Sequence, residues 1–248
     1  MSKLRPWSSI QIVDCGEALI PIPDDFLRID PHPYVSLGAP YGELCDPWLL
    51  REGVIDRLLL AQDILKRNHS EFRFSIFDAW RPIPVQKFMF EYSLDQACIS
   101  KGVERYEPSH RDRFNRVFEE VSQFWAEPST NPETPPPHST GAAIDLTLSD
   151  LNGNQLNMGS EIDFVGEMSR PNYFENVNTH SAQCISFHLK RKALSDAMIN
   201  AGFVQHPLEW WHFSFGDQLW AWITQRNKAI YSSYSLHERS DNTFSSPS

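Results

Sequence analysis

The sequence predicts an α+β fold, in which helices and short strands are interspersed without the strand–helix–strand rhythm of a parallel α/β sheet. Apolar residues recur at helical spacing in several segments, and short alternating runs lie between those segments. Neither an internal repeat nor a change in composition divides the chain. We therefore expect a single domain over residues 1–230, followed by a polar, Ser-rich tail over residues 231–248 that we expect to be disordered.

The first half of the chain is expected to contain three helices and one strand. For the first helix, Asp46 is the predicted N-cap, and Pro47 would occupy the first helical position. The third is predicted from a stripe of apolar and aromatic side chains that begins at Phe114 and ends at Trp125. The predicted elements are helices over residues 46–67, 85–99 and after Pro108, and a strand over residues 72–77.

A Pro-rich loop is expected to separate the two halves. Residues 127–137 contain five prolines in eleven positions, which excludes regular structure and predicts a stiff, extended segment. A strand over residues 142–148 should follow it directly. Residues 186–201 are predicted to form a helix that ends at Gly202, and residues 203–215 a strand pair or one bent strand.

Composition and charge exclude some functions. A formal net charge of -10 argues against a nucleic-acid surface and, more weakly, against docking on anionic membranes. No apolar run is long enough to span a bilayer, and the N-terminus lacks the features of an export signal. The four cysteines form no C-x-x-C pair, so we expect reduced core thiols in a cytoplasmic protein.

The segment HSTGAAIDLTL carries the first candidate site residues. His138 and Asp145 are seven positions apart, and Gly141 between them permits a tight turn with positive φ. On the following strand, Asp145 would share one face with small side chains, while the alternate positions are aliphatic and would face the core. This pattern is typical of a cleft that contains one carboxylate ligand. The alternative is a loop histidine followed by an ordinary strand aspartate.

The segment LEWWHF carries the second pair. Glu209 and His212 are three positions apart, so a regular strand would place them on opposite faces, and a bend near Glu209 is required if both are to meet one metal. A partly buried glutamate must be paired, coordinated or shifted in pKa. The two tryptophans between them would exclude water and hold both side chains. The alternative is a structural Glu–His pair beneath an aromatic cluster.

Together, the two segments predict a zinc site. His138, Asp145 and His212 would supply three ligands and leave the fourth position to water, as in catalytic zinc sites. Glu209 would be the free carboxylate that removes a proton from that water. The H-E-x-x-H helix of better-known zinc peptidases is absent. The other histidines are interpreted as surface or structural residues, with His206 kept as a candidate neighbour of the site.

These motifs resemble those of the VanX-type D-alanyl-D-alanine dipeptidases. HSTGAAID and EWWH are similar to the S-x-H-x-x-G-x-A-x-D and E-x-x-H motifs of that family, and FDAWRP, MGSEID and ALSDAMINAGFVQHPLEWWHF look like further counterparts in the same order. The likeness covers roughly residues 30–215. It implies a Hedgehog/DD-peptidase-like fold with a small antiparallel sheet and flanking helices, one Zn²⁺ per chain, and the ligands and base named above.

The resemblance also implies roles for three further residues. Arg81 in FDAWRP would stabilise the transition state, where a guanidinium can meet the developing oxyanion; the alternative is a salt-bridge partner of Asp78. Asp163 in MGSEID would lie near the free ammonium of the substrate, and a capping or turn role is the alternative. Tyr34 would line the same pocket or pack in the core.

The expected activity is hydrolysis of D-alanyl-D-alanine to two D-alanines in the cytoplasm, with a small dipeptide as the substrate and neither nucleic acid nor membrane as a partner. The alternatives are a carboxypeptidase acting on peptidoglycan stem peptides, a dipeptidase of broader specificity, and a metal-binding module without turnover. One departure bears on specificity: the family has Ser two positions before the first histidine ligand, whereas this chain has Pro136 and Pro137. Contacts from a hydroxyl or N–H group there to the substrate carboxylate cannot form.

Overall fold

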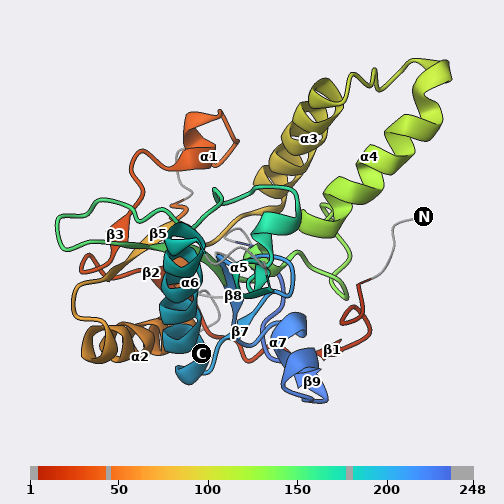
Figure 1. Ribbon diagram of the computed structural model, residues 1–248. Helices are drawn as coiled ribbons and strands as arrows, with labels where there is room; N and C mark the ends of the chain where they lie inside the picture. The colour runs from red at the N-terminus through yellow and green to blue at the C-terminus, as the bar shows by residue number, and fades with distance from the viewer. Residues whose placement is uncertain (1–4, 43–45, 177–180, 236–248) are drawn as a thin grey trace, which may run out of the picture.

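The computed structural model describes residues 5–42, 46–176 and 181–235, and Figure 1 shows how their elements are arranged. The strands are β1 Gln11–Ile12, β2 Leu19–Pro21, β3 Leu27–Arg28, β4 Leu49–Arg51, β5 Arg73–Asp78, β6 Ala143–Ser149, β7 Val204–Gln205, β8 His212–Ser214 and β9 Lys228–Ala229. The α-helices are α1 Pro33–Ser36, α2 Glu52–Asn68, α3 Ile83–Ser100, α4 Arg111–Phe124, α5 Tyr173–Asn176, α6 Ala182–Asn200 and α7 Gln218–Ile223. Short 3₁₀ helices span Pro108–His110, Pro137–Thr140 and Glu167–Ser169.

A five-stranded sheet in the order β3-β5-β6-β8-β7 forms the centre of the molecule. The predicted antiparallel sheet with flanking helices is confirmed for β5, β6, β8 and β7, and β3 adds a parallel edge strand. The aliphatic side of β6 (Ile144, Leu146 and Leu148) packs with residues of α2 and α6 in one core cluster. The opposite side of β6 therefore carries Asp145, as the alternation of the sequence predicts.

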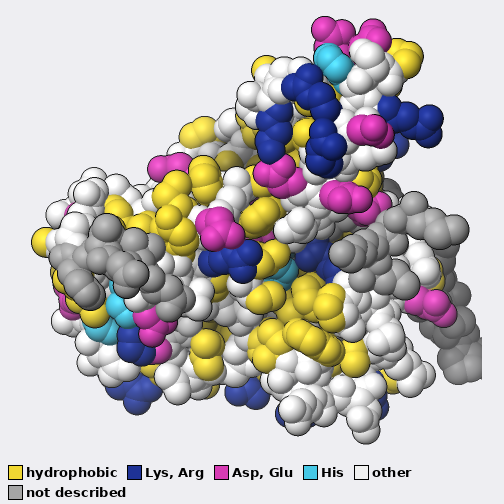
Figure 2. All heavy atoms as spheres, turned by 45° about the vertical axis from the view of Figure 1, so that its right-hand side comes forward, with side chains coloured by type: hydrophobic (Ala, Val, Ile, Leu, Met, Phe, Trp, Pro, Cys, Tyr) yellow, Lys and Arg dark blue, Asp and Glu magenta, His cyan; other side chains and the backbone are white. Residues whose placement is uncertain are grey.

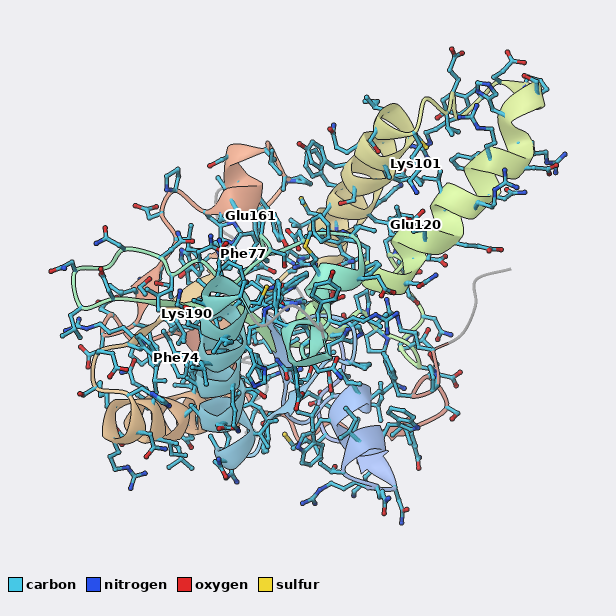
Figure 3. All side chains as sticks on the ribbon, viewed as in Figure 1. Phe74, Phe77, Lys101, Glu120, Glu161 and Lys190 are labelled. Atoms are coloured by element: carbon cyan, nitrogen blue, oxygen red, sulfur yellow. The ribbon has the colours of Figure 1, made fainter. Side chains whose placement is uncertain are left out.

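Helices α3 and α4 form a hairpin that projects from the body of the molecule (Figure 1). Aromatic side chains close the hairpin, with Phe90 and Phe118 in an edge contact at 5.6 Å between ring centroids. Lys101, just after α3, forms an ion pair with Glu120 of α4 (Figure 3). The predicted second and third helices are confirmed, and the hairpin has its own apolar cluster that extends to the end of α4 near Trp125.

The first predicted helix begins too early. Residues 49–51 form β4, which pairs with β2, and α2 starts at Glu52. Asp46 does accept a hydrogen bond from the backbone N–H of Trp48 at 2.8 Å, so its side chain closes a turn and not a helix. Pairing with a strand 30 residues away overrides the local helical pattern, which sequence spacing alone cannot reveal.

The C-terminal half follows the prediction closely. Helix α6 starts at Ala182, four residues before the predicted start, because Ser181 caps it through the N–H of Cys184. It ends before Gly202, whose φ is 100°. Strands β7 and β8 are the predicted strand pair. Within the described residues, no helix is both long and apolar enough to cross a bilayer.

Two sequence predictions are left partly open. Cys98 is buried as expected, but Cys15 is exposed, so the expectation of core thiols is wrong for that residue. Cys45 and most of the predicted polar tail, from residue 236 onward, lie outside the described residues. A single domain over residues 1–230 stays a prediction.

Candidate metal centre

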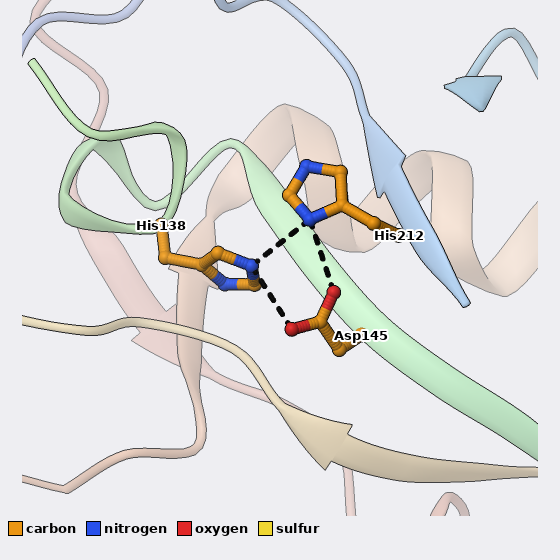
Figure 4. Close-up of side chains that lie close together, drawn as sticks. All are labelled: His138, Asp145 and His212. Atoms are coloured by element: carbon orange, nitrogen blue, oxygen red, sulfur yellow. Dashed lines mark hydrogen bonds and ion pairs between the residues drawn. The ribbon is translucent and has the colours of Figure 1, made fainter. Parts of the chain in front are cut away.

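His138, Asp145 and His212 converge at the centre of the sheet (Figure 4). Asp145 on β6 and His212 on β8 are paired directly across the two strands, which brings their side chains together on one face. Asp145 Oδ1 lies 3.0 Å from His212 Nδ1, and Asp145 Oδ2 lies 3.1 Å from His138 Nε2. The two imidazole nitrogens are 3.2 Å apart. All three residues are buried.

The turn before β6 places His138 in this group. His138 belongs to the 3₁₀ helix Pro137–Thr140, and Gly141 ends that helix with φ at 71°. A Cβ atom at Gly141 would lie 2.2 Å from Cδ2 of Leu19, so both the conformation and the space require glycine. The sequence prediction of a positive-φ turn at Gly141 is confirmed.

Hydrogen bonds outside the group set the tautomers of both histidines. His138 Nδ1 lies 2.7 Å from the carbonyl oxygen of Ala79, which can only accept, so Nδ1 carries the proton and Nε2 presents a lone pair. His212 Nε2 lies 3.3 Å from Ser214 Oγ and can donate to it, which leaves a lone pair on Nδ1. In neutral histidines, two nitrogen lone pairs and a carboxylate therefore face one another. Such a group of acceptors calls for a cation.

The spacing of the three donor atoms fits zinc. Ligands at about 2.0–2.1 Å from a tetrahedral zinc ion are separated from each other by roughly 3.3 Å. The closest approaches between the three residues are 3.0–3.2 Å, with one Asp145 oxygen facing each histidine, and lie close to that value. Burial alone would raise the pKa of Asp145, but its neighbours His138 and His212 lower it well below its ordinary value. The carboxylate is therefore ionised, as a metal ligand must be.

Glu209 lies beside the group without joining it. It occupies the turn between β7 and β8, so the bend that the sequence requires is present. Its Oε2 is 3.7 Å from His212 Nδ1, and the side chain is buried. Burial, and then the charge of Asp145, raise the pKa of Glu209 to about 8. A buried carboxyl with a pKa near neutrality is suited to accept and return a proton.

The two tryptophans of LEWWHF lie in the core next to the pocket. Trp210 and Trp211 are both buried in the main core cluster, where their rings meet edge to face. Trp210 Nε1 donates to Ser160 Oγ at 2.9 Å, which fixes the turn to the loop before Asp163. Trp211 also lines the pocket. The segment between Glu209 and His212 is therefore fixed by packing and by one hydrogen bond.

Arg81 is buried beside the ligands and is not a surface residue. Its Nε and Nη2 donate to Asp78 Oδ2 at 2.9 and 2.6 Å, and Nη2 also lies 3.3 Å from Asp145 Oδ2. The Asp78 partner anticipated in the sequence is thus present, within the site. Nη1 donates to Gln86 Oε1 at 3.0 Å, and among the described residues its second hydrogen has no acceptor. One N–H group is therefore available to a ligand in the pocket.

Asp163 lines the pocket, whereas Tyr34 packs in the core behind it and contacts it by a hydrogen bond. The Tyr34 hydroxyl donates to Asp163 Oδ2 at 2.9 Å and accepts from Arg81 Nη2 at 3.2 Å. Asp163 has φ at 66° and lines the pocket, so it is a turn residue whose side chain points into the site. Burial, and then the charge of Asp145, raise the pKa of Asp163 to about 7. Tyr34 therefore has two roles: its ring packs in the core, and its hydroxyl orients the Asp163 carboxyl.

One pocket connects these groups, and several of its residues were not found in the sequence. At the base of the projecting hairpin, the surface in Figure 2 is hollowed, and basic and histidine atoms lie there among hydrophobic side chains. His206 lines it, with Nδ1 3.6 Å from Glu209 Oε1, in agreement with its candidate place beside the site. The residues missed in the sequence are Arg5, Gln86, Phe124, Trp125 and Ala126. Arg5 and the residues at the end of α4 carry no recognisable motif.

Comparison with known proteins identifies the family of the chain. Residues 30–233 match the family model of M15 peptidases described as D-ala-D-ala dipeptidase. The chain is 42% identical over 224 residues to a D-alanyl-D-alanine dipeptidase of Synechocystis sp., covering 88% of this chain and 90% of the relative. It is 40% identical to the enzyme of that name from Enterococcus faecium over 84 residues, or 33% of this chain and 37% of the relative.

Among solved structures, the D,D-pentapeptidase VanY in complex with Zn(II) aligns with a TM-score of 0.46 and 11% identity, covering 90% of this chain and 96% of that one. The family match spans most of the chain and contains Arg81, Asp163 and all four residues of the two predicted metal-site motifs. The chain belongs to the D-ala-D-ala dipeptidase family of M15 peptidases.

Proposed function

We propose that the protein is a zinc-dependent dipeptidase that hydrolyses D-alanyl-D-alanine to two D-alanines. The observation that carries this proposal is the convergence of three buried residues, whose facing atoms approach one another to 3.0–3.2 Å, beside a glutamate that does not join them. The membership of the dipeptidase family supports the substrate class. A binding module would need the three ligands, but it would need neither Glu209 nor Arg81.

His138, Asp145 and His212 would hold one zinc ion per chain. Two imidazoles and one carboxylate are a ligand set that catalytic zinc sites use, and the donor spacing fits tetrahedral coordination. When bound, zinc makes water nucleophilic near neutral pH and polarises the peptide carbonyl. The backbone carbonyl of Ala79 and the hydroxyl of Ser214 would hold the two rings in the required tautomers.

Glu209 would act as general base and then as general acid. Its Oε2 lies 3.7 Å from His212 Nδ1, and this proximity to the proposed ligands supports a role in taking a proton from the attacking water. The same carboxyl would return that proton to the nitrogen of the leaving D-alanine. Because burial raises its pKa to about 8, the protonated form is accessible at the stage when the amine must leave.

Arg81 would stabilise negative charge on the carbonyl oxygen. The guanidinium is held by Asp78 on one side and by Gln86 on the other, so its position is fixed before the substrate binds. Its unpaired Nη1 hydrogen is available to the oxyanion. Asp163, held by Tyr34, would bind the free ammonium of the substrate, which separates a dipeptide from the end of a longer chain.

The proposed function is tested with a panel of substrates on one zinc-analysed sample. We expect hydrolysis of D-alanyl-D-alanine with one zinc per chain, loss of activity on chelation, and recovery when zinc is restored. Little cleavage is expected for the L,L and mixed dipeptides and for a stem pentapeptide that ends in D-alanyl-D-alanine. A preference for the pentapeptide would replace the proposal with a carboxypeptidase, and equal rates on all dipeptides would replace it with a broad dipeptidase.

We also propose that the enzyme acts in the cytoplasm. The location rests on the sequence expectation alone. Cell fractionation with an antibody to the native chain tests it, and recovery of the protein in the extracellular or envelope fraction would contradict it.

A further inference from the structure

We propose that Arg5 binds the C-terminal carboxylate of the dipeptide and so determines the specificity of this site for a free dipeptide. The inference rests on the proposed function. Arg5 lies outside residues 30–233, which match the family model, so it cannot be assigned by that likeness. Its guanidinium nevertheless lines the same pocket as the metal ligands, Glu209 and Asp163.

The N-terminal segment is anchored in a way that fixes Arg5 at the pocket. Trp7 is buried in a cluster with residues of α7 and β9, and its ring meets that of His206 edge to face at 5.8 Å. The turn that starts at Arg5 is closed by a hydrogen bond from the Ser8 N–H to the Arg5 carbonyl at 2.9 Å. Farther on, β1 pairs with β9. These contacts keep the side chain of Arg5 directed toward the site.

The contacts of the guanidinium leave its charge unpaired. Nη1 lies 3.3 Å from His206 Nε2, and Nη2 donates to the carbonyl of Ser122 at 3.4 Å. Among the described residues, no carboxylate forms an ion pair with it. Burial lowers the pKa of Arg5, although the charges of Glu209 and Glu127 favour the cation without contacting it. A partly buried guanidinium with spare N–H donors, facing a pocket, is suited to an anionic ligand.

The position of Arg5 agrees with the direction of the reaction. Glu209 returns its proton to the amine of the leaving residue, and that residue carries the substrate's carboxylate. Arg5 contacts His206, which in turn lies 3.6 Å from Glu209, so the cation is on the leaving-group side. Asp163 shares the Tyr34 hydroxyl with Arg81 and therefore lies near Arg81 in the pocket. The pocket therefore offers an anion for the ammonium and a cation for the carboxylate.

The loop before His138 cannot bind the substrate carboxylate through a side-chain or backbone donor at Pro136 or Pro137. Pro137 lines the pocket, but neither it nor Pro136 has an N–H group or a hydroxyl that could donate to a carboxylate. Phe124, Trp125 and Ala126 line the pocket with apolar side chains. Arg5 thus supplies a strong donor that the neighbouring lining lacks. A zwitterionic dipeptide would be bound at both of its ends.

The test compares D-alanyl-D-alanine with its C-terminal amide, in which the carboxylate charge is removed. For Arg5→Ala we expect KM for the free acid to rise about 10- to 100-fold, the range for one charge-assisted hydrogen bond, with kcat changed less than about threefold. The amide should be nearly unaffected, so the ratio of kcat/KM for acid to amide should collapse. Arg5→Lys should recover part of it. Arg116→Ala, at an exposed position on α4, is the matched control and should keep the original values.

Binding to the metal-free protein gives a second readout that needs no turnover. Calorimetric titration should show weaker binding of D-alanyl-D-alanine to Arg5→Ala than to the unaltered chain, with unchanged binding of the amide. Equal losses for acid and amide, or no loss for either, would overturn the role of Arg5 and leave the dipeptidase itself intact. Failure of the unaltered, zinc-loaded chain to hydrolyse the dipeptide would overturn the proposed function instead.

Discussion

The residues proposed to bind the metal and those proposed to select the substrate come from different kinds of structure. Asp145 and His212 lie opposite each other on paired strands of the central sheet, and His138 follows from a turn directly joined to β6. Asp163 and Arg5 instead come from a loop and from the N-terminal segment. Side chains on paired strands are held more precisely than side chains on loops, so the sheet is suited to hold the residues that bind the metal. The surrounding segments are suited to selecting the substrate.

The largest effect is expected from the ligands. His138→Ala and His212→Ala should reduce bound zinc from one per chain to near zero and lower activity to background, because two remaining ligands do not hold the ion. Metal analysis after dialysis, together with the melting temperature of each variant, measures this. A fully zinc-loaded, folded variant of either kind would refute the ligand assignment.

Glu209 comes next, because it acts on the reaction without holding the metal. Glu209→Gln keeps the shape of the side chain but cannot accept a proton, so kcat should fall by about 10²–10⁴-fold. Zinc content should stay at one per chain. Turnover close to the original rate in a zinc-loaded sample would exclude Glu209 as the base and indicate a structural Glu–His pair.

Arg81 should have a smaller effect on the rate and an added effect on stability. Arg81→Ala removes one donor to the oxyanion, and kcat should fall by roughly 10²–10³-fold with zinc retained. It also leaves Asp78 buried without its main partner, so the melting temperature should drop. Arg81→Lys retains the charge and serves as the control for stability. If Arg81→Ala is folded and keeps its rate, the residue is only structural.

Asp163 is expected to affect binding more than the chemical step. Asp163→Asn should raise KM for D-alanyl-D-alanine about 10- to 100-fold, the range for losing a charge-assisted contact, and change kcat little. N-acetyl-D-alanyl-D-alanine, which lacks the ammonium, should be affected far less by the same change. Equal losses with both substrates would show that Asp163 does not read the ammonium.

The smallest expected effect is on the pH dependence of stability. The folded state raises the pKa of Asp163 from its ordinary value to about 7, so its protonated form favours folding. That contribution is fully present below the ordinary pKa and is lost as the pH rises through about 7. In the metal-free protein, Asp163→Asn should therefore flatten the fall in melting temperature between about pH 4 and pH 8. An unchanged profile would contradict the shift.

The same contrast explains what the sequence predicts well. The four residues proposed for metal binding and proton transfer lie in two short motifs, and alternation on β6 correctly predicts the face that carries Asp145. Arg5 was missed, because its place depends on Trp7 packing against α7 and β9, more than 200 residues later in the chain. The sequence also predicts too early a start for α2. The cause is similar, because β4 forms only through its pairing with β2. Long-range pairing of this kind has no local signature.

The most direct measurement of the central claim is anomalous diffraction at the zinc edge from crystals of the zinc-loaded protein. The account predicts one peak per chain, at about 2.0–2.2 Å from His138 Nε2, His212 Nδ1 and an oxygen of Asp145, with Glu209 outside bonding distance. A zinc ion bound at other residues, or loaded protein without a peak at this site, would contradict it.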